Sequence, residues 1–151
     1  MVSRQALTTL PPLAAASLTL TAPAKVNLYL RVVNRRPDGF HNLETLMVAI
    51  DFCDTLEFSP AEPGSISLTI ANELAPGAVA ETGAPLAVGE DNLVLRAARL
   101  LASEAGVNFG AAIHLTKRIP WAAGLAGGSS DAATTLSGLN RLWRLDWPLE
   151  R

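Results

Sequence analysis

One stretch of the chain combines glycines, serines and a helix start in an order typical of phosphate binding. Residues 120–133 read PWAAGLAGGSSDAA and follow the apolar run 111–116, which is typical of a strand; a helical pattern then ends near Trp143. Glycines let backbone N–H groups approach a ligand, and a helix N-terminus adds unpaired N–H donors and about half a positive charge. Strand, glycine loop and helix start therefore predict a phosphate site.

This glycine loop matches neither of two common nucleotide-binding motifs. Ser129 and Ser130 follow Gly128 where a Walker A loop has lysine, and the Gly-x-Gly-x-x-Gly spacing of dinucleotide-binding proteins is absent. A plain connecting loop with a serine cap is the alternative interpretation. The length of the loop and its paired serines favour phosphate binding over that alternative.

Two other places hold residues that could contact a ligand. Lys25 and Asn27 lie two residues apart in a strand-like pattern, so their side chains point to the same side; a solvated strand face would look the same. His41 follows a Pro-Asp-Gly turn at 37–39, and a histidine beside a turn is more often structural than functional. The residues alone leave both alternatives open.

The composition limits the class of protein. With 151 residues, 49% hydrophobic and 17% charged, the chain fits one folded domain with a core. Its net charge of −2 offers no basic surface for nucleic acid, so an anionic ligand must be held by local donors. The single Cys53 can form no internal disulfide or zinc site, which favours a reducing, cytoplasmic setting and a role as a small buried hydrophobe.

We expect a loose N-terminal extension at residues 1–17 and no membrane segment. An early arginine and an apolar middle are shared with signal peptides, but Pro11, Pro12 and several threonines interrupt the apolar run. No stretch approaches the roughly eighteen apolar residues that span a bilayer. Residues 146–150, DWPLE, are typical of a helix start, which indicates that the chain is the N-terminal part of a longer protein.

The elements that must position these residues begin with strands. Residues 17–33 predict a strand with one buried face, since four apolar residues alternate with polar ones: Val26, Leu28, Leu30 and Val32. We expect further strands at 43–50 and 55–59, separated by a turn at 51–54, and a strand at 65–70 that pairs with 55–59. Residues 71–90, rich in proline, glycine and alanine, then predict a long surface loop.

Helices occupy the second half of the chain. Asp91 and Asn92 precede a helical pattern at 93–102, and Gly106 follows its end, which predicts a capped helix. After the strand at 111–116, the helix that follows the glycine loop presents one apolar face: Ala132, Leu136, Leu139 and Trp143. Because most strands come early and helices late, the order is typical of the α+β class.

Three segments together resemble the GHMP kinases, the family of galactokinase, homoserine kinase, mevalonate kinase and phosphomevalonate kinase. They are 22–30 (APAKVNLYL), 36–45 (RPDGFHNLET), and 91–93 (DNL) with the loop at 120–133. Pro-Ala-Lys-x-Asn-Leu with Asp-Gly-aromatic-His is similar to the branch that acts on a cytidylated methylerythritol, whereas the glycine loop indicates only the family. The resemblance extends over about residues 22–143.

The resemblance implies a fold and an activity. The fold would be α+β, like the second domain of ribosomal protein S5, with a mostly antiparallel sheet packed with helices and an ATP-binding domain at 18–151. The activity would be transfer of the ATP γ-phosphoryl group, with Mg²⁺, to the 2-hydroxyl of the methylerythritol unit in non-mevalonate isoprenoid synthesis. Lys25 would stabilise the transferring group, Asn27 would bind substrate, and Phe40 and His41 would hold cytosine.

The nucleotide side of the implied site consists of small residues and two longer side chains. Positions that match the family's phosphate loop and adenosine contacts, with Ser130 also near the metal ion, are Asn92, Lys117, Pro120, Gly124, Leu125, Ala126, Gly127, Gly128, Ser129 and Ser130. Phe40 replaces the usual tyrosine, which keeps the stacking face and loses a hydroxyl. Residues 121–123 and Ala126 stand where glycine is frequent, which predicts a stiffer loop.

We assign no catalytic base. In the family, the catalytic aspartate lies in a Gly-Ala-Asp-Val-Pro-type segment beyond the helix of the glycine loop, and no such segment precedes Arg151; the second domain is also absent. The 151-residue chain alone is therefore expected to be inactive and to retain binding at most. Two alternatives stay open: another GHMP small-molecule kinase, and a non-catalytic nucleotide-binding module. All three readings imply small-molecule ligands, without nucleic acid or membrane, and leave the oligomeric state unknown.

Overall fold

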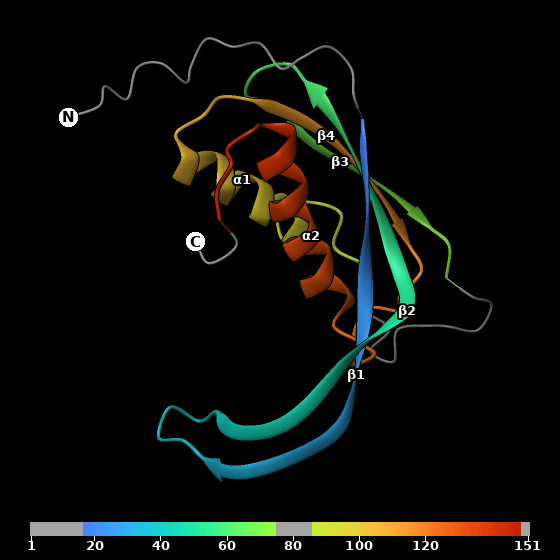
Figure 1. The fold of residues 1–151 in the computed structure, drawn as a ribbon, viewed down its shortest axis with the longest axis vertical. Coiled ribbons are helices and arrows are strands. Elements are labelled where there is room, and N and C mark those ends of the chain that lie inside the picture. The colour runs from blue at the N-terminus through green and yellow to red at the C-terminus, as the bar shows by residue number, and fades with distance from the viewer. Residues whose placement is uncertain (1–16, 75–85, 149–151) are drawn as a thin grey trace.

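The computed structural model describes residues 17–74 and 86–148 as a four-stranded sheet with two helices on one side (Figure 1). The elements are β1 (Leu18–Arg35), β2 (His41–Ala61), β3 (Ile66–Asn72), α1 (Leu93–Ala105), β4 (Gly110–Lys117) and α2 (Gly127–Leu142). Their order confirms the predicted α+β class. The predicted N-terminal extension, apart from Ser17, and much of the predicted loop at 71–90 lie outside the described residues.

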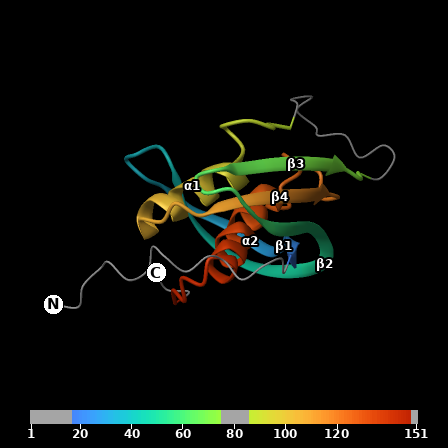
Figure 2. The same ribbon diagram turned by 90° about the horizontal axis from the view of Figure 1, so that it is seen from above.

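The sheet has the order β1-β2-β4-β3, as Figure 2 shows from above. β1 with β2 and β2 with β4 are antiparallel, while β3 and β4 are parallel, with α1 between them in the chain. A mostly antiparallel sheet was expected, but the predicted pairing of 65–70 with 55–59 was wrong. The crossover through α1 lets β4 lie between β2 and β3. Alternation within a short strand does not show which strand it pairs with.

The predicted turn at 51–54 was also wrong, because β2 is continuous through these residues. The register moves from Pro23 opposite Cys53 to Ala24 opposite Ile50, so Asp51 and Phe52 have no opposite residue on β1. Such a bulge bends a strand without reversing it. Polar residues at a bulge therefore gave the same sequence pattern as a turn. Cys53, expected to be buried, is half-buried.

Beyond this bulge, β1 and β2 leave the helices and form a two-stranded arm, residues 27–49, which curves away below the rest of the molecule in Figure 1. We call the remainder the body. The predicted turn at 37–39 is confirmed: Gly39 has a φ of 88°, and its N–H donates to Arg36 O at 3.0 Å.

Both faces of the arm are exposed, which contradicts the predicted buried face. Leu28, Leu30 and Val32 are 65%, 53% and 58% exposed. Alternation of apolar residues shows which side chains share a face, but burial needs a second layer over that face. Neither of the two described helices extends over the arm (Figure 1).

The core lies between the helices and the inner face of the sheet. Its buried residues are Ala22, Leu56, Phe58, Val94, Ala98, Leu101, Ala111, Ile113, Leu115, Leu139 and Trp143. On α2, the predicted apolar face was right at Leu139 and Trp143, but Leu136 is 40% exposed. Gly138 is buried instead, and a Cβ there would lie 2.5 Å from the Phe58 ring, so α2 packs very close to β2. This packing fixes α2 against the sheet.

Candidate functional site

The glycine loop leads into an N-terminus of α2 that no side chain caps among the described residues. Ala126 is the N-cap residue and makes no side-chain hydrogen bond. Ser130 N, 3.0 Å from Ala126 O, makes the first hydrogen bond of the helix, so the N–H groups of residues 127–129 have no acceptor within it. Free donors at the positive end of a helix dipole are suited to an anion such as phosphate.

The loop before α2 has an unusual backbone conformation. Ala122 and Ala126 have φ values of 60° and 58°, and Gly124 has 72°. A residue with a Cβ loses roughly 1–2 kcal/mol in this left-handed region. Such strain persists only where the surrounding structure enforces it, and it concentrates at ligand-binding sites. The two alanines thus stand where glycine would be unstrained, and the stiffness of the loop stays a prediction.

Lys25 and Asn27 lie beside this loop. Lys25 N donates to Leu125 O at 3.0 Å, which joins β1 to the loop, and Lys25 Nζ lies 3.4 Å from Asn27 Oδ1. The predicted convergence of these two side chains is confirmed. Their contact with a ligand stays a prediction.

Phe40 and His41 lie at the other end of the arm. Phe40 N donates to Asp38 Oδ1 at 3.1 Å, and the Phe40 side chain is 71% exposed. His41 is opposite Arg35, whereas Asn27 is opposite Met47, so about 25 Å of strand separates the two pairs at 3.3 Å per residue. The two pairs of candidate residues therefore lie at opposite ends of the arm.

Asn92 caps α1 next to the start of α2. Its Oδ1 accepts a hydrogen bond from Val94 N at 2.8 Å, and its Nδ2 donates to Ala87 O at 2.6 Å. A Cβ on Gly128 would lie 3.5 Å from Leu93 Cδ1, so the two helix starts are neighbours. The predicted cap of α1 is confirmed, and Gly106 ends the helix as expected. A contact between Asn92 and adenosine stays a prediction.

Lys117 lies in the interior, paired with two carboxylates that the sequence did not single out. Its Nζ donates to Asp54 Oδ2 and, at 2.9 Å, to Asp131 Oδ2; all three side chains are nearly inaccessible. We call these residues the ion cluster. The sequence gave no signal for Asp131, because its burial depends on how α2 packs against the sheet. Asp54 was missed as well, because it fell in the predicted turn at 51–54.

The ion cluster contains one cation and two carboxylates, so it carries an excess negative charge. Burial, helped by the neighbouring Asp54 and opposed by the hydrogen bond and charge of Lys117, raises the pKa of Asp131 to about 6. Within the described residues, Asp131 Oδ1 is buried and has no hydrogen-bond partner. The burial of Asp131 therefore carries an uncompensated free-energy cost of desolvation.

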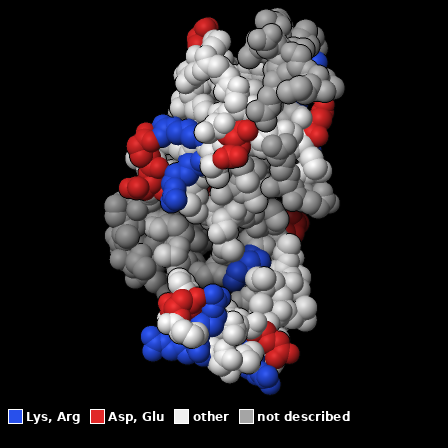
Figure 3. All heavy atoms as spheres, turned by 90° about the vertical axis from the view of Figure 1, so that its left-hand side faces the viewer, with Lys and Arg blue, Asp and Glu red and all other residues white. Residues whose placement is uncertain are grey.

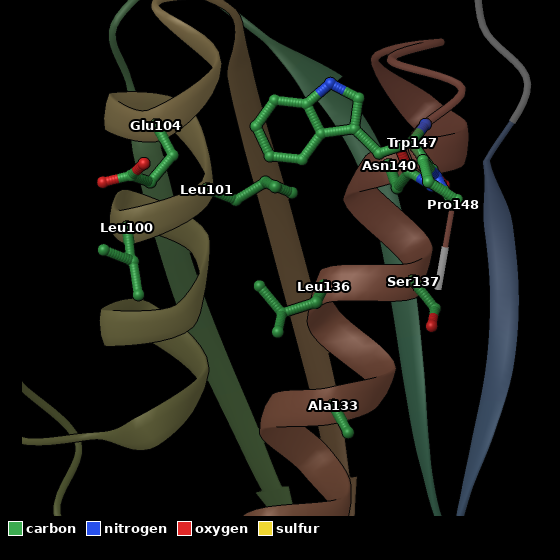
Figure 4. Close-up of a pocket in the computed structure, with 9 residues that line it drawn as sticks. All are labelled: Leu100, Leu101, Glu104, Ala133, Leu136, Ser137, Asn140, Trp147 and Pro148. Carbon is green, nitrogen blue, oxygen red and sulfur yellow. The ribbon is translucent and has the colours of Figure 1, made fainter. Parts of the chain in front are cut away.

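The groove between α1 and α2 has a chemistry different from that of the glycine loop (Figure 4). It measures about 380 Å³; Leu136 projects into it from α2, Leu100 and Leu101 line it from α1, and the Trp147 ring lies across one end. Its described lining contains no lysine or arginine, and it follows the later turns of α2. It is therefore no candidate for phosphate binding.

The surface charges are mixed. In Figure 3, basic and acidic side chains are interspersed over both the body and the arm on the face shown. No group of three or more histidine, cysteine or acidic residues within 17–74 and 86–148 is arranged to hold a metal ion. No helix in these two ranges has the length and apolar character needed to cross a membrane.

Comparison with known sequences identifies relatives over most of the chain. Residues 92–151 match the family model for the GHMP kinases N terminal domain. The chain is 51% identical over 130 residues to 4-diphosphocytidyl-2-C-methyl-D-erythritol kinase of Chromobacterium violaceum, and 52% identical over 134 residues to that of Paramagnetospirillum magneticum. These matches cover 86% and 89% of this chain but 42% and 43% of the relatives. The chain thus spans less than half of their length.

Comparison with solved structures also finds kinases that match this chain. A crystal structure of 4-(cytidine 5′-diphospho)-2C-methyl-D-erythritol kinase matches with a TM-score of 0.67 and 40% identity, over 87% of this chain and 43% of that one. Homoserine kinase from Cytophaga hutchinsonii matches with a TM-score of 0.63 and 20% identity, over 91% of this chain and 38% of that one. The second match shows a shared fold alone.

Proposed function

We propose that the chain belongs to the GHMP kinase family, whose N terminal domain model matches residues 92–151, and that the full-length protein transfers the γ-phosphoryl group of ATP to the 2-hydroxyl of 4-diphosphocytidyl-2-C-methyl-D-erythritol. One observation supports the proposal: the hydrogen bond from Lys25 N to Leu125 O joins the strand that carries this lysine to the loop before an uncapped, glycine-rich helix start. Phosphoryl transfer depends mainly on positioning the phosphates and on stabilising their charge. This chain offers residues for both tasks.

The phosphates of ATP bind the free N–H groups of residues 127–129. Gly124 supports this arrangement, since a Cβ there would meet no atom within 4 Å, which leaves space above the loop. Mg²⁺, when bound with ATP, neutralises phosphate charge, and the Ser130 hydroxyl is the ligand that this chain would offer. Asn92 and Lys117 belong to the adenosine side in the family, and both are engaged within the protein here.

The transfer breaks the bond between the γ-phosphorus and the bridging oxygen and forms a bond from that phosphorus to the substrate oxygen. The substrate hydroxyl loses its proton in the same reaction. Lys25 stabilises negative charge on the transferring group, and Asn27, 3.4 Å from its ammonium, binds the substrate next to it. We assign the proton to an aspartate in the half of the relatives that this chain does not match.

The cytidine end of the substrate binds toward the tip of the arm. Phe40 offers an exposed ring for stacking on cytosine, and His41 offers a ring nitrogen for hydrogen bonding. The intervening residues of the arm are apolar and exposed, including Leu30 and Met47. The arm thus provides a surface from the reacting hydroxyl toward the base.

An assay of ADP release by the full-length protein tests this function. We expect turnover with ATP and the cytidylated substrate, and none with mevalonate or homoserine. Lys25→Ala should lower turnover about 10²-fold or more, because it removes a charge from the transition state, while ATP binding is retained. The exposed Arg96 of α1 provides the control variant Arg96→Ala, which should behave as the wild type.

Three results would contradict the assignment. Phosphorylation of mevalonate or homoserine but not of the cytidylated substrate would favour another kinase of the family. ATP binding without any phosphoryl transfer would favour a non-catalytic nucleotide-binding module. Unchanged turnover in Lys25→Ala would remove this lysine from the reaction.

A further inference from the structure

The ion cluster of Asp54, Lys117 and Asp131 lies directly beneath the glycine loop. We propose that it positions the phosphate-binding loop, and that Lys117 acts on the nucleotide through the loop instead of touching it. The proposal rests on the kinase function above, because it assumes that the loop binds ATP.

The ammonium of Lys117 supports the first residue of α2. A Cβ built on Gly127 would lie 2.9 Å from Lys117 Nζ and 2.9 Å from Ile119 Cγ2. The backbone of α2 therefore approaches the ammonium so closely that only glycine fits without a shift. A movement of this ammonium would move the N–H groups that face the phosphates.

The ion cluster fixes the loop at both of its ends. Before the loop, Asp54 Oδ1 accepts hydrogen bonds from Arg118 N at 2.6 Å and Ile119 N at 2.8 Å. After the loop, Asp131 on α2 accepts from Lys117 Nζ at 2.9 Å. The strained backbone at residues 122–126 lies between these two attachments. Strain of this kind is kept only where the flanking structure holds it.

Lys117 is poorly placed for a direct ligand contact. Its side chain is 1% exposed, and its ammonium already donates to carboxylates from two different elements, β2 and α2. To reach a nucleotide it would have to leave both carboxylates buried without a cation, which is strongly unfavourable. Its contribution to ATP binding is therefore indirect.

Stability alone does not account for Asp131. Its second oxygen is buried without a partner in the described part of the chain. Without Asp131, Lys117 would still be paired with Asp54, and the cluster would become neutral. A buried ion cluster can often be replaced as a whole by well-packed apolar residues without loss of stability. A positioning role therefore explains Asp131 where a stabilising role does not.

The test measures ATP binding by calorimetry and thermal unfolding of the full-length protein. Asp131→Ala should raise the Kd for ATP about tenfold, because the start of α2 loses its hydrogen bond to Lys117, and it should lower the unfolding temperature less than Leu139→Ala does. The KM for the second substrate should change less than about twofold. Asp131→Asn should stay within about threefold of the wild-type Kd, because its amide oxygen still accepts from Lys117.

Leu139→Ala is the matched control for a merely structural effect. Leu139 is buried on the same helix but away from the ion cluster. This variant should lower the unfolding temperature and leave the Kd for ATP unchanged.

Two outcomes would overturn the inference: an unchanged Kd in Asp131→Ala, or an equal rise in Asp131→Asn. ATP binding is measured without the second substrate. A protein that binds ATP but transfers no phosphoryl group would therefore contradict the proposed function and not this inference. If the enzyme is active and its Asp131→Ala variant binds ATP normally, this inference is contradicted and the proposed function is not.

Discussion

The body and the arm share the strands β1 and β2 but differ in what surrounds them. In the body, Ala22 and Ala24 of β1 are fully buried beneath α2, whereas Leu30 and Val32 of the same strand are more than half exposed in the arm. Both segments carry strand-forming residues in extended conformation. Strand formation and burial are therefore separate outcomes, and burial depends on an element that covers the strand.

The same difference separates the two proposed ligands. The loop for ATP is held by buried contacts of the body, while Phe40 and His41 stand at the exposed tip of the arm. Regions with few buried contacts open and move more readily than the core. We therefore expect the ATP side to be preformed and the arm to adjust when the second substrate binds.

The largest effect is expected from breaking the interior of the body at Lys117. Lys117→Met leaves Asp54 and Asp131 buried without a cation, and should lower the free energy of unfolding by about 3–5 kcal/mol. Urea denaturation of the 151-residue chain measures it. Arg96→Met on the exposed side of α1 is the control and should change that free energy by less than about 0.5 kcal/mol. Equal values for the two variants would mean that the ion cluster does not hold the body together.

A pair of leucines compares the two regions directly. Leu139→Ala, at a fully buried position of α2, should lower the free energy of unfolding by about 2–5 kcal/mol, because it removes packed methyl groups and leaves a cavity. Leu30→Ala in the arm should lower it by less than about 0.5 kcal/mol. Similar losses at both positions would show that the arm is as well packed as the body.

The smallest effect concerns strain in the loop. Ala126→Gly should raise the free energy of unfolding by about 0.5 kcal/mol, because relief of the left-handed strain exceeds the entropy that glycine gains in the unfolded chain. Ala123→Gly is the control: Ala123 has no positive φ, so glycine there should lower the same quantity by about 0.5–1 kcal/mol. The same sign for both variants in urea denaturation would argue against strain at Ala126.

Local signals in the sequence were enough for much of the fold. The Asn92 cap, the turn at 37–39 and the start of α2 after the glycine loop were all predicted, because each depends on residues adjacent in the chain. The parallel partner of β3 and the continuity of β2 through Asp51 were missed, since both depend on distant pairing. Period and propensity describe a strand but not its neighbours.

In the candidate site, too, local features were predicted and features that depend on distant contacts were missed. The proximity of Lys25 and Asn27 followed from their spacing on one strand. The ion cluster did not, because Asp54 and Asp131 are separated from Lys117 by 63 and 14 residues and meet only in the folded chain. Whether a charged residue is buried depends on contacts between residues that are distant in the chain. The sequence alone therefore placed Lys117 on the ligand side and did not indicate its carboxylate partners.

The most direct test of the account is a crossed measurement of KM in the full-length protein with ATP and the cytidylated substrate. His41→Ala, in the arm, should raise the KM for the cytidylated substrate about tenfold and leave that for ATP within about twofold. Asp131→Ala, beneath the loop, should do the reverse. The account predicts this crossed pattern; equal changes of both KM values in both variants would contradict the assignment of ATP to the loop and of the second substrate to the arm.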